Sequence, residues 1–523
     1  MHFSKNATHF FETTRSNSMR SNSNLYVALR NAFPSNMQQC AVETDSGLTY
    51  SWQDLEDASA MVANLWVSLE LEPGARIAVQ VEKSVEALIV YLATLRTGLV
   101  FLPLNTAYLK AELEYFITDA APAVVVCSGA NFGWVSKLAF TSGTEYVFTL
   151  NDDRTGSLLE RAAQCSRVHQ PVAVSNDDLA AIIYTSGTTG RSKGAMLSHN
   201  NLRSNARVLQ QYWDWQKSDV LIHALPIFHV HGLFVAIHGA LINGSKMLWM
   251  NKFDPKSVLR WLPQATVFMG VPTMYVRLLA QDGLSQESAQ SMRLFVSGSA
   301  PLLIEHFKAW QERTGHTILE RYGMSETVML TSNPCRAGDG LRKGGTVGFA
   351  LPGVQVRVRG DQGQTLGVGE VGGIEVKGPN VFQGYWHMPE KTAQEFTSDG
   401  FFKTGDVGTI DAQGTICIVG RSKDLIISGG YNVYPAEVEG FINALPGVAE
   451  SAVVGVPDAD FGEVGVAVVV AKPGVTLDPQ AVIAQIKSQL ANFKVPKRCF
   501  VVDDLPRNAM GKVQKNSLRS QYA

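Results

Sequence analysis

The chain has 523 residues, of which 45% are hydrophobic and 18% are charged, and its formal net charge is −2. This length predicts roughly two to four domains with sizeable cores, and the near-neutral charge argues against a dedicated nucleic-acid binder. The six cysteines are scattered without a C-x-x-C pair, so we expect reduced thiols rather than a zinc site or a disulfide framework.

The N-terminal stretch is rich in Ser and Asn and carries Lys5, Arg15 and Arg20 against one acid, Glu12. It lacks the apolar core of a secretory signal, so we interpret residues 1–24 as a flexible extension. We therefore expect a cytoplasmic protein, with organellar targeting by the extension as the alternative.

From Leu25 onward, short β-rich runs alternate with helical runs, as in "RIAVQV" followed by "SVEALIVYLATLRTG". This alternation predicts parallel sheets with helices on their faces. The richest apolar stretch, "ALIVYLATLRTGLVFLPL", is interrupted by Arg96 and falls short of the ~20 residues that a membrane span requires. It predicts a buried helix that leads into a strand, and we expect no membrane span.

The stretch "YTSGTTGRSKGAMLSH", from Tyr184 to His199, places glycines, hydroxyl side chains and two cations between apolar flanks. "LAAIIYTSG" predicts a buried strand, and Ser198 is a suitable N-cap for the helix "HNNLRSNARVLQQYW". Strand, loop and helix can present backbone N–H groups and Lys193 to an anion, although such a loop can also be an ordinary turn. The spacing G-x-x-G-x-x-K differs from the Walker pattern and disfavours an ordinary P-loop kinase or GTPase.

Around Val347 the sequence changes to Gly-punctuated β segments such as "GTVGFALPGVQVRVRG" and "GEVGGIEVKG". These segments predict a compact antiparallel subdomain. The last ~100 residues contain helical and strand patterns that could form a domain of their own. We predict an α/β protein with a large N-terminal domain of stacked α/β sheets plus this β subdomain (25–421), a hinge (422–425) and a small α+β C-terminal domain (426–523).

Five motifs occur together in one order: "YTSGTTGRSKGAMLSH", "RYGMSET", "TGD", "GRSKDLIISGGYNVYPAEVE" and "PRNAMGKVQK". In order and spacing they resemble the adenylate-forming superfamily, which contains acyl-CoA synthetases, adenylation domains of peptide synthetases and firefly-type luciferases. The resemblance implies a two-step reaction that uses ATP. A carboxylate attacks the α-phosphate of ATP to give an acyl adenylate and pyrophosphate, and a thiol, usually that of coenzyme A, then displaces AMP.

The resemblance also implies which residues bind ATP and Mg²⁺. The β- and γ-phosphates would contact Thr185, Ser186, Gly187, Thr188, Thr189, Gly190 and Lys193. The adenine pocket and the α-phosphate contacts would come from Gly298, Ser299, Ala300, Pro301, Arg321, Tyr322, Gly323, Met324 and Ser325. The superfamily more often has Thr in place of Ser325, and the hydroxyl is retained.

Three further side chains complete the implied nucleotide site. Asp406 would accept hydrogen bonds from both ribose hydroxyls and Arg421 would add a fixed donor fork; a surface ion pair is the alternative. Glu326, together with Thr185, would hold Mg²⁺, a hard cation that prefers oxygen ligands.

Lys512 in "PRNAMGKVQK" is the expected catalytic residue of the first step, because a cation between the acyl oxygen and the α-phosphate lowers the barrier between two anions. In the superfamily the small C-terminal domain is mobile and swings about the hinge after adenylation, with Asp424 as the pivot here. The swing would withdraw Lys512 and bring the segment with Gly429, Gly430 and Tyr431 to the active site to shape the thiol tunnel. Its glycines permit a close backbone approach.

The stretch "HALPIFHVHGLF" supplies His229 and His231 near the expected carboxylate site, where His229 would gate entry of the acid and later of CoA. A core histidine bonded to the backbone is the alternative for each. In "GVPTMYVRLLA", Thr273 would open a helix at the substrate pocket and Arg277 would lie one turn deeper on the same face.

A deep cation is costly unless it is paired, and it suits a substrate with a second carboxylate, which Arg can bind bidentately. A solvent-facing or structural role is the alternative for Arg277. A second candidate is Arg293, which lies four strand residues, or ~13 Å, before Ser297 at the substrate pocket.

The flanking sequences "EKSVEALIVYLATLRTGLVFLPLNTAY", "LERYGMSET" and "DLPRNAMGKVQKN" closely resemble malonyl-CoA synthetases, which activate malonate and small 2-substituted malonates. Val230 and Met324 would keep the acid pocket short. We therefore expect malonate, ATP, Mg²⁺ and coenzyme A as ligands, with malonyl-CoA as the product. The alternatives are a short- or medium-chain or aryl acyl-CoA synthetase, a luciferase-type oxygenase, and a non-catalytic binding protein that keeps the fold.

Overall fold

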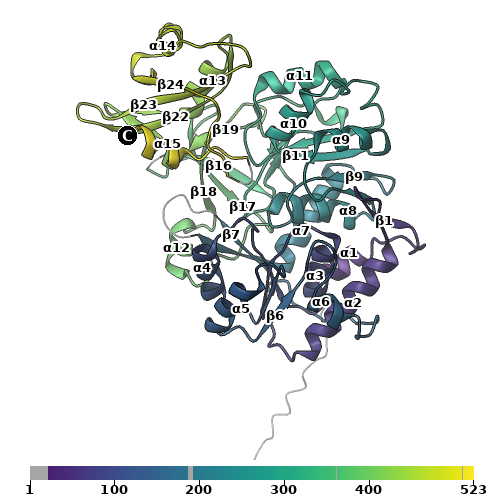
Figure 1. The fold of residues 1–523 in the computed structure, drawn as a ribbon. Helices are drawn as coiled ribbons and strands as arrows, with labels where there is room; N and C mark the ends of the chain where they lie inside the picture. Colours follow the sequence, from purple (N-terminus) through teal and green to yellow (C-terminus); the bar gives the residue numbers. More distant parts are fainter. Residues whose placement is uncertain (1–21, 186–191, 361, 509–510) are drawn as a thin grey trace, which may run out of the picture.

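The structure is a computed structural model, and it describes residues 22–185, 192–360, 362–508 and 511–523. Figure 1 shows an N-terminal part built from two helix-covered sheets, a β subdomain beside them, and a C-terminal domain at one end. We call the sheets first to fourth in the order given below.

The first sheet has the strand order β6-β5-β3-β4-β7-β8, and its pairs are parallel except β7–β8. Its strands are β3 (Arg76–Gln80), β4 (Val100–Pro103), β5 (Val124–Cys127), β6 (Tyr146–Thr149), β7 (Leu179–Thr185) and β8 (Lys193–Ser198). Helices α2 (Trp52–Ser68), α3 (Val85–Arg96) and α6 (Ser157–Ala162) cover one face, and α4 (Lys110–Ala120) and α5 (Phe132–Thr141) cover the other.

The second sheet has the order β15-β14-β13-β12-β11-β9-β10-β1-β2, with parallel strands in the middle and antiparallel pairs at both edges. Its strands are β1 (Cys40–Thr44), β2 (Thr49–Ser51), β9 (Val220–His223), β10 (Lys246–Trp249), β11 (Val267–Gly270), β12 (Leu294–Ser297), β13 (Leu319–Tyr322), β14 (Thr331–Ser332) and β15 (Phe349–Ala350).

Helices cover both faces of the second sheet. One face carries α1 (Leu25–Arg30), α7 (His199–Tyr212), the π-helical turn η1 (His231–Ile237) and α8 (His238–Leu241). The other carries α9 (Pro255–Trp261), η2 (Leu262–Gln264), α10 (Pro272–Leu279) and α11 (Ile304–Thr314). A single apolar core runs from the first sheet to the second, and Tyr91 Oη lies 2.7 Å from His238 Nε2 inside it. The two sheets therefore form one packed body.

The third sheet is the β subdomain, with the antiparallel order β16-β17-β18-β19. Its strands are β16 (Gln355–Arg359), β17 (Gly372–Lys377), β18 (Phe402–Ile410) and β19 (Ile416–Arg421), and α12 (Pro389–Glu395) lies in the connection between β17 and β18. The short η3 (Ala337–Asp339) lies between β14 and β15 of the second sheet. The third sheet confirms the antiparallel subdomain expected from the Gly-punctuated segments.

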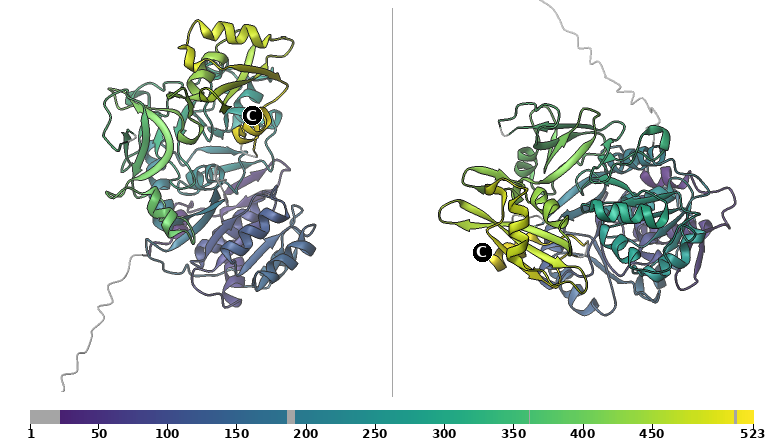
Figure 2. Two further views of the ribbon diagram at one scale, coloured as in Figure 1. Left: turned by 90° about the vertical axis from the view of Figure 1, so that its left-hand side faces the viewer. Right: turned by 90° about the horizontal axis from the view of Figure 1, so that it is seen from above.

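The fourth sheet belongs to the C-terminal domain and joins the rest through η4 (Ser422–Asp424). Its strands are β20 (Ile426–Ser428), β21 (Tyr431–Val433), β22 (Val448–Asp458), β23 (Gly462–Ala471) and β24 (Arg498–Val502), and its helices are α13 (Pro435–Asn443), α14 (Pro479–Lys487), η5 (Asn492–Lys494) and α15 (Lys515–Tyr522). Separate apolar cores fill its two faces. Figure 2 shows this domain at one end of the molecule, away from the first sheet.

Several expected elements are confirmed. Ser198 caps α7 with a capping box to Asn201, and the stretch around Arg96 forms the buried helix α3 followed by β4. The strand before the glycine motif and the helix after it are confirmed as β7 and α7, but the expected loop between them is too long, because "KGAMLS" is the strand β8 and pairs with β7. β8 contains no β-branched residue and depends on pairing with β7, so local sequence propensity does not predict it.

The expected extension is shorter than residues 1–24. Asn24 is buried, caps α1, and donates from Nδ2 to the carbonyl oxygens of Leu95 (2.7 Å) and Val172 (2.9 Å). Residues 22–24 are therefore part of the body, and residues 1–21 lie outside the described range.

Candidate active site

The candidate site lies at the carboxyl ends of the parallel strands β11, β12 and β13, which end at Gly270, Ser297 and Tyr322. Loops at this edge are the usual ligand-binding position of an α/β sheet. Asp406 in the middle of β18, Arg421 at the end of β19 and the turn that carries Lys512 face the same edge, because Lys512 interacts electrostatically with Asp406, Arg421 and Glu326. The motifs that the sequence places far apart therefore meet in one cleft.

The two expected ribose-binding residues are brought together. Asp406 and Arg421 are cross-strand partners in β18 and β19, and Arg421 Nε lies 2.7 Å from Asp406 Oδ1. Tyr322 also donates a hydrogen bond to Asp406. Burial raises the pKa of Asp406, while the positive charge of Arg421 opposes the rise. The carboxylate is thus anchored by two donors, and its role toward ribose stays a prediction.

Glu326 is buried, and its Oε1 accepts a hydrogen bond of 2.9 Å from Tyr385 Oη. Burial raises the pKa of Glu326, and the hydrogen bond together with Arg421 and Lys193 opposes that rise. Mg²⁺ in nucleotide sites is commonly held by one or two carboxylates and the phosphate oxygens. The donor set therefore fits Mg²⁺: Glu326 would supply a carboxylate oxygen and Thr185, at the end of β7, a hydroxyl.

The expected phosphate-binding motif is described only in part. Thr185 ends β7 and Lys193 begins β8, opposite each other in the hairpin. Lys193 Nζ lies 4.2 Å from the centroid of the Tyr385 ring and 3.7 Å from Glu395 Oε1. The predicted contacts Ser186, Gly187, Thr188, Thr189 and Gly190 lie outside the described residues.

The expected adenine segment, Gly298 to Pro301, follows β12 directly. Ser299 has a left-handed backbone with φ +72°, a conformation that is strained for a residue with a side chain and often marks a functional turn. Its Oγ lies 3.3 Å from Nδ1 of His231. Gly298 must lack a side chain, because a Cβ there would meet the Arg321 guanidinium at 2.4 Å.

Lys512 projects from a tight turn of the C-terminal domain into the cleft. The turn is closed by hydrogen bonds between Asn508 and Lys512 (2.9 Å) and from Arg507 to the Gly511 carbonyl (2.8 Å). It rests on the first turn of α10, since a Cβ on Gly511 would lie 3.1 Å from Thr273 Oγ1. Lys512 is exposed along part of its length. Burial of its ammonium end, with the charges of Arg421 and Arg321, lowers its pKa from 10.5 to about 8, although Asp406 and Glu326 act in the opposite direction.

His229 stands beside Lys512 and stays neutral. Burial, followed by the charges of Lys512 and Arg321, lowers its pKa to about 3. Its Nδ1 accepts a hydrogen bond of 3.2 Å from the backbone N–H of His231, which places the ring proton on Nε2. His229 can therefore donate a hydrogen bond into the cleft without carrying a charge.

Arg321 is the most unusual cation of the site. It is only 4% exposed, and its Nε and Nη2 have no hydrogen-bond partner among the described residues. Burial lowers its pKa to about 9. Its charge acts on His229, His231 and Lys512. The family resemblance assigned Arg321 to the nucleotide, but the structure places its guanidinium with the histidines.

The two arginines that the sequence offered as partners of a second substrate carboxylate do not lie in the cleft as expected. Arg277 is exposed and not deep, because α10 buries Tyr275 and Leu278 against the sheet and turns Arg277 outward. Arg293 donates from Nε to Asp219 (2.9 Å) and from Nη1 to the Trp213 carbonyl (3.0 Å), so it is engaged in a structural pair. Neither position supports the role of a buried acid anchor.

The remaining substrate candidates surround the acid side of the cleft. Val230 and Ser297 are buried, Met324 and Thr273 are partly exposed, and the Ser297 hydroxyl and His231 Nε2 have no hydrogen-bond partner among the described residues. Polar atoms without partners are rare inside proteins. This side of the cleft thus offers polar atoms to a ligand.

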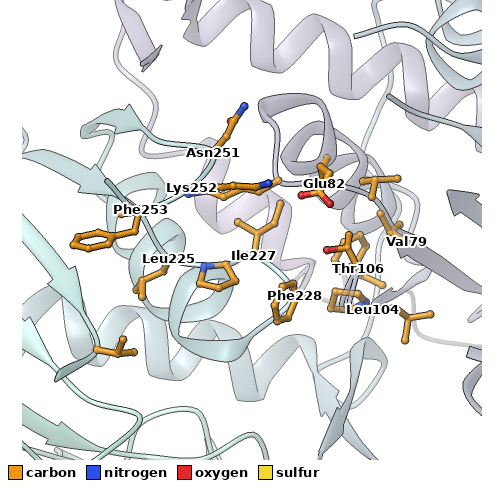
Figure 3. Close-up of a pocket in the computed structure, with 18 of the residues that line it drawn as sticks. Val79, Glu82, Leu104, Thr106, Leu225, Ile227, Phe228, Asn251, Lys252 and Phe253 are labelled. Atoms are coloured by element: carbon orange, nitrogen blue, oxygen red, sulfur yellow. The ribbon is translucent and has the colours of Figure 1, made fainter. Parts of the chain in front are cut away.

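A cavity of about 260 Å³ opens behind the loop that leads to His229. Figure 3 shows Val79, Glu82 and Thr106 from the first sheet facing Leu225, Ile227 and Phe228 from the second. Val271 and Met274, on either side of Thr273, complete its wall near the cleft. The cavity is mostly apolar and lies where the loops of the two sheets meet.

The expected hinge and CoA-binding residues lie at the junction with the C-terminal domain. Asp424 Oδ1 accepts a hydrogen bond of 2.8 Å from Arg519 of α15. Gly429 and Gly430 form the two-residue turn between β20 and β21. Their φ angles are +57° and +82°, and a hairpin turn of this type requires positive φ at both positions. Tyr431 is exposed and stacks on Phe493 of its own domain. Their roles in the domain swing stay predictions.

Sequence reasoning missed Tyr385, the partner of Glu326 and Lys193. It lies outside the five motifs, and its only sequence signal is the run "GPNVFQGYW", whose Gly and Asn suggest a bent segment. In the part of the chain that the structure describes, no helix is long and apolar enough to cross a membrane.

Comparisons with known proteins agree with this geometry. The sequence model of the family described as AMP-binding enzyme matches residues 30–386, and that of the AMP-binding enzyme C-terminal domain matches residues 437–512. The malonate–CoA ligase of Arabidopsis thaliana is 35% identical in an alignment that covers 99% of this chain and 92% of that protein. The human mitochondrial malonate–CoA ligase is 36% identical in an alignment that covers 82% of this chain and 79% of that protein.

Among solved structures, MatB from Rhodopseudomonas palustris is 53% identical and superimposes over 96% of this chain and 99% of its own. The TM-score is 0.93 for its ATP-bound structure and 0.83 for its apo structure. The arrangement of domains described above, with Lys512 in the cleft, is therefore closer to the ATP-bound one. From its motifs, its fold and these matches, the chain belongs to the AMP-binding enzyme family.

Proposed function

We propose that this protein is an ATP-dependent malonate–CoA ligase. In the first step a carboxylate oxygen of malonate bonds to the α-phosphorus of ATP, and pyrophosphate leaves. In the second step the thiol sulfur of CoA bonds to the acyl carbon of malonyl adenylate, the acyl–phosphate bond breaks, and AMP leaves. The thiol proton goes to solvent, and the product is malonyl-CoA.

The observation that carries this proposal is the buried, unpaired guanidinium of Arg321. A charge removed from water without a partner costs several kcal/mol. Because no carboxylate of the described residues forms an ion pair with it, a ligand with its own negative charge can supply the missing partner. A monocarboxylic acid uses its only carboxylate in the reaction, so a second carboxylate is needed to reach Arg321.

The position of Arg321 favours a short diacid. Lys512, which would contact the reacting carboxylate, and Arg321 both act on the same imidazole of His229. Two cations that both act on one side chain suit a small substrate with two carboxylates, and malonate is such an acid. Val230 and Met324 would limit the substituent at the central carbon of malonate, so small 2-substituted malonates are the related acids to compare.

Each residue then has a stated task in adenylation. Lys512 stabilises the negative charge shared by the acyl oxygen and the α-phosphate in the transition state. His229 donates a hydrogen bond from Nε2 to the reacting carboxylate and adds no charge. Lys193 holds the departing pyrophosphate. Bound Mg²⁺, held by Glu326 and Thr185, would neutralise charge on the phosphates.

We further propose that the cavity behind Phe228 admits the pantetheine arm of CoA. Its walls are mostly apolar, as suits an uncharged arm, and Glu82, Thr106 and Asn251 supply polar atoms at its lining. His229 lies directly after Phe228 in the chain, so a thiol in this cavity would approach the acyl carbon past the imidazole. The swing of the C-terminal domain would remove Lys512 from the cleft before this step.

The proposal is tested by pyrophosphate release with ATP, Mg²⁺ and CoA, comparing malonate, methylmalonate, acetate, octanoate and coumarate. Wild type should prefer malonate. Arg321→Met should lower kcat/KM for malonate at least about 100-fold, as loss of one partner of a buried pair predicts. Arg277→Ala is the matched control and should leave malonate use nearly unchanged.

The same variant gives an independent check on stability. Replacing an unpaired buried cation by an apolar side chain removes a desolvation cost, so Arg321→Met without substrate should unfold at the same or a higher urea concentration than wild type. Loss of malonate use together with preserved stability supports the anchor. The role of Arg321 would be contradicted if wild type preferred acetate or octanoate, or if Arg277→Ala lost its activity with malonate.

We propose a cytoplasmic location, although the human relative is named as mitochondrial. Fusing residues 1–24 to a fluorescent protein and imaging its location would test this, since organellar import of the fusion would contradict it.

A further inference from the structure

Segment 379–386 crosses from the third sheet to the first and is held at several points. Asn201 Nδ2 donates to the carbonyl oxygens of Pro379 (2.8 Å) and Val381 (2.9 Å). Asn380 Nδ2 donates to those of Thr327 (2.7 Å) and Met329 (2.9 Å), next to Glu326. The segment is therefore fixed both to α7 and to the chain that carries the expected metal ligand.

The end of this segment pairs with β8. The Met196 N–H donates to the Gly384 carbonyl (3.0 Å), and the Trp386 N–H donates to the Gly194 carbonyl (2.8 Å). Tyr385 is thus the antiparallel partner of Ala195, two residues after Lys193. Figure 1 shows α12, which follows this segment, beside the first sheet.

Tyr385 contacts two parts of the nucleotide site at once. Tyr385 is 4% exposed, and its hydroxyl donates a hydrogen bond of 2.9 Å to Glu326 Oε1. Lys193 Nζ lies over its ring, 4.2 Å from the centroid. Glu326 comes from the second sheet's edge and Lys193 from the first sheet. One rigid ring therefore joins the expected metal ligand to the expected phosphate ligand.

We propose that Tyr385 is a positioning residue that couples Mg²⁺ binding at Glu326 to phosphate binding at Lys193. This inference rests on the proposed function only in requiring ATP and Mg²⁺. The hydroxyl occupies Oε1 and leaves Oε2 of Glu326 for the metal. The ring sets the position of the Lys193 ammonium by a cation–π contact.

Two neighbouring groups are consistent with this role. Burial and the negative charge of Glu326 raise the pKa of Tyr385, so the phenol keeps the proton that it donates. Glu395 Oε1 lies 3.7 Å from Lys193 Nζ and 2.8 Å from Lys391 Nζ. With Lys391 as a second partner for Glu395, Lys193 can exchange that carboxylate for a phosphate while the Tyr385 ring keeps its place.

The test measures ATP binding by calorimetry, without any carboxylic acid, once in EDTA and once in saturating Mg²⁺. The dissociation constant of ATP in EDTA divided by that in Mg²⁺ gives the coupling between metal binding and nucleotide binding. Tyr385→Phe keeps the ring and loses the hydroxyl. It should leave the metal-free dissociation constant unchanged and reduce the ratio by about tenfold, as loss of one hydrogen bond to a charged group predicts.

Two further variants separate the parts of this role. Tyr385→Leu also removes the ring, so it should weaken metal-free ATP binding as well. Tyr26→Phe is the matched control, because Tyr26 is a buried tyrosine whose hydroxyl donates to Glu56 at 2.8 Å, far from the cleft. It should change thermal stability alone.

The outcomes are distinct. An unchanged ratio in Tyr385→Phe, or equal weakening of both dissociation constants, would overturn the inference and leave Tyr385 a packing residue. Wild-type protein that binds no ATP would overturn the proposed function itself, and this inference with it.

Discussion

Several cations lie at the acid side of the cleft, and only some of them have a carboxylate partner. Arg421 has Asp406 as its partner at 2.7 Å, whereas Arg321 has no ion pair among the described residues. Burial and the charges of both arginines lower the pKa of Lys512 to about 8. The side chains of the cleft thus carry more positive than paired negative charge, as a site for a triphosphate and a diacid requires.

The lowered pKa of Lys512 predicts a pH dependence of adenylation. Only the protonated lysine can stabilise the anionic transition state, and a group with a pKa of about 8 loses its proton as pH rises through that value. We expect kcat/KM for malonate-dependent ATP–pyrophosphate exchange to be level below this pKa and to fall roughly tenfold per pH unit above it.

The control for this profile is Lys512→Arg. A guanidinium has a higher intrinsic pKa than an ammonium group, so the variant should be slower and its alkaline fall should move to higher pH. The same fall in Lys512→Arg would assign the titration to another group and contradict the role of Lys512.

At the scale of elements, the site depends on where strands end. Three parallel neighbours, β11, β12 and β13, deliver the segments that follow Gly270, Ser297 and Tyr322 to one edge. The π-helical turn η1 begins at His231, and such turns often mark functional positions because they displace side chains from regular helical spacing. Loop 225–229 lies between this edge and the cavity of Figure 3.

Filling that cavity should separate the two half-reactions. Ile227→Trp would occupy the space proposed for the pantetheine arm. We expect ATP–pyrophosphate exchange with malonate to stay near the wild-type rate, and KM for CoA in the full reaction to rise about tenfold, as loss of a few apolar contacts predicts.

Val67→Trp is the control, because Val67 is an exposed position of α2, away from the cleft. A loss of exchange in Ile227→Trp would show that the cavity serves the acid and not the thiol.

At the scale of the whole molecule, cores divide the chain into two bodies. The first and second sheets share one apolar core, whereas the C-terminal domain fills its own two cores. A domain with separate cores can rotate without exposing much apolar surface. In the present arrangement, polar contacts cross the junction: Lys472 Nζ lies 2.7 Å from Glu305 Oε1 of α11.

This ion pair should contribute little to the choice of conformation. Its side chains are 43% and 51% exposed, and exposed pairs contribute about 0–1 kcal/mol. Glu305→Lys should therefore slow adenylation by at most about fivefold and leave thioester formation from added malonyl adenylate unchanged.

The exchanged pair Glu305→Lys/Lys472→Glu should restore the adenylation rate, and high salt should reduce the difference between the variants. A loss far beyond this range, or one that the exchange does not restore, would mean that the pair does more than align two surfaces.

The fold class and most of the nucleotide site follow from local patterns. Alternating apolar runs predict the parallel sheets, Ser198 predicts the start of α7, and the motifs with Glu326, Asp406 and Lys512 identify residues that the fold brings into one cleft. Such signals depend on neighbours within a turn or a strand, where backbone geometry is nearly fixed.

Burial and long-range contacts were decided by the tertiary structure alone. Spacing placed Arg277 on the same helix face as Thr273, but only the packing of α10 against its sheet shows that Arg277 is exposed while Arg321 is buried without a partner. Tyr385 meets Glu326 and Lys193 because segment 379–386 pairs with β8. The sequence by itself therefore determined the family and the reaction type, whereas the acid anchor and the Tyr385 contact depend on elements far apart in the chain, whose mutual packing no local pattern encodes.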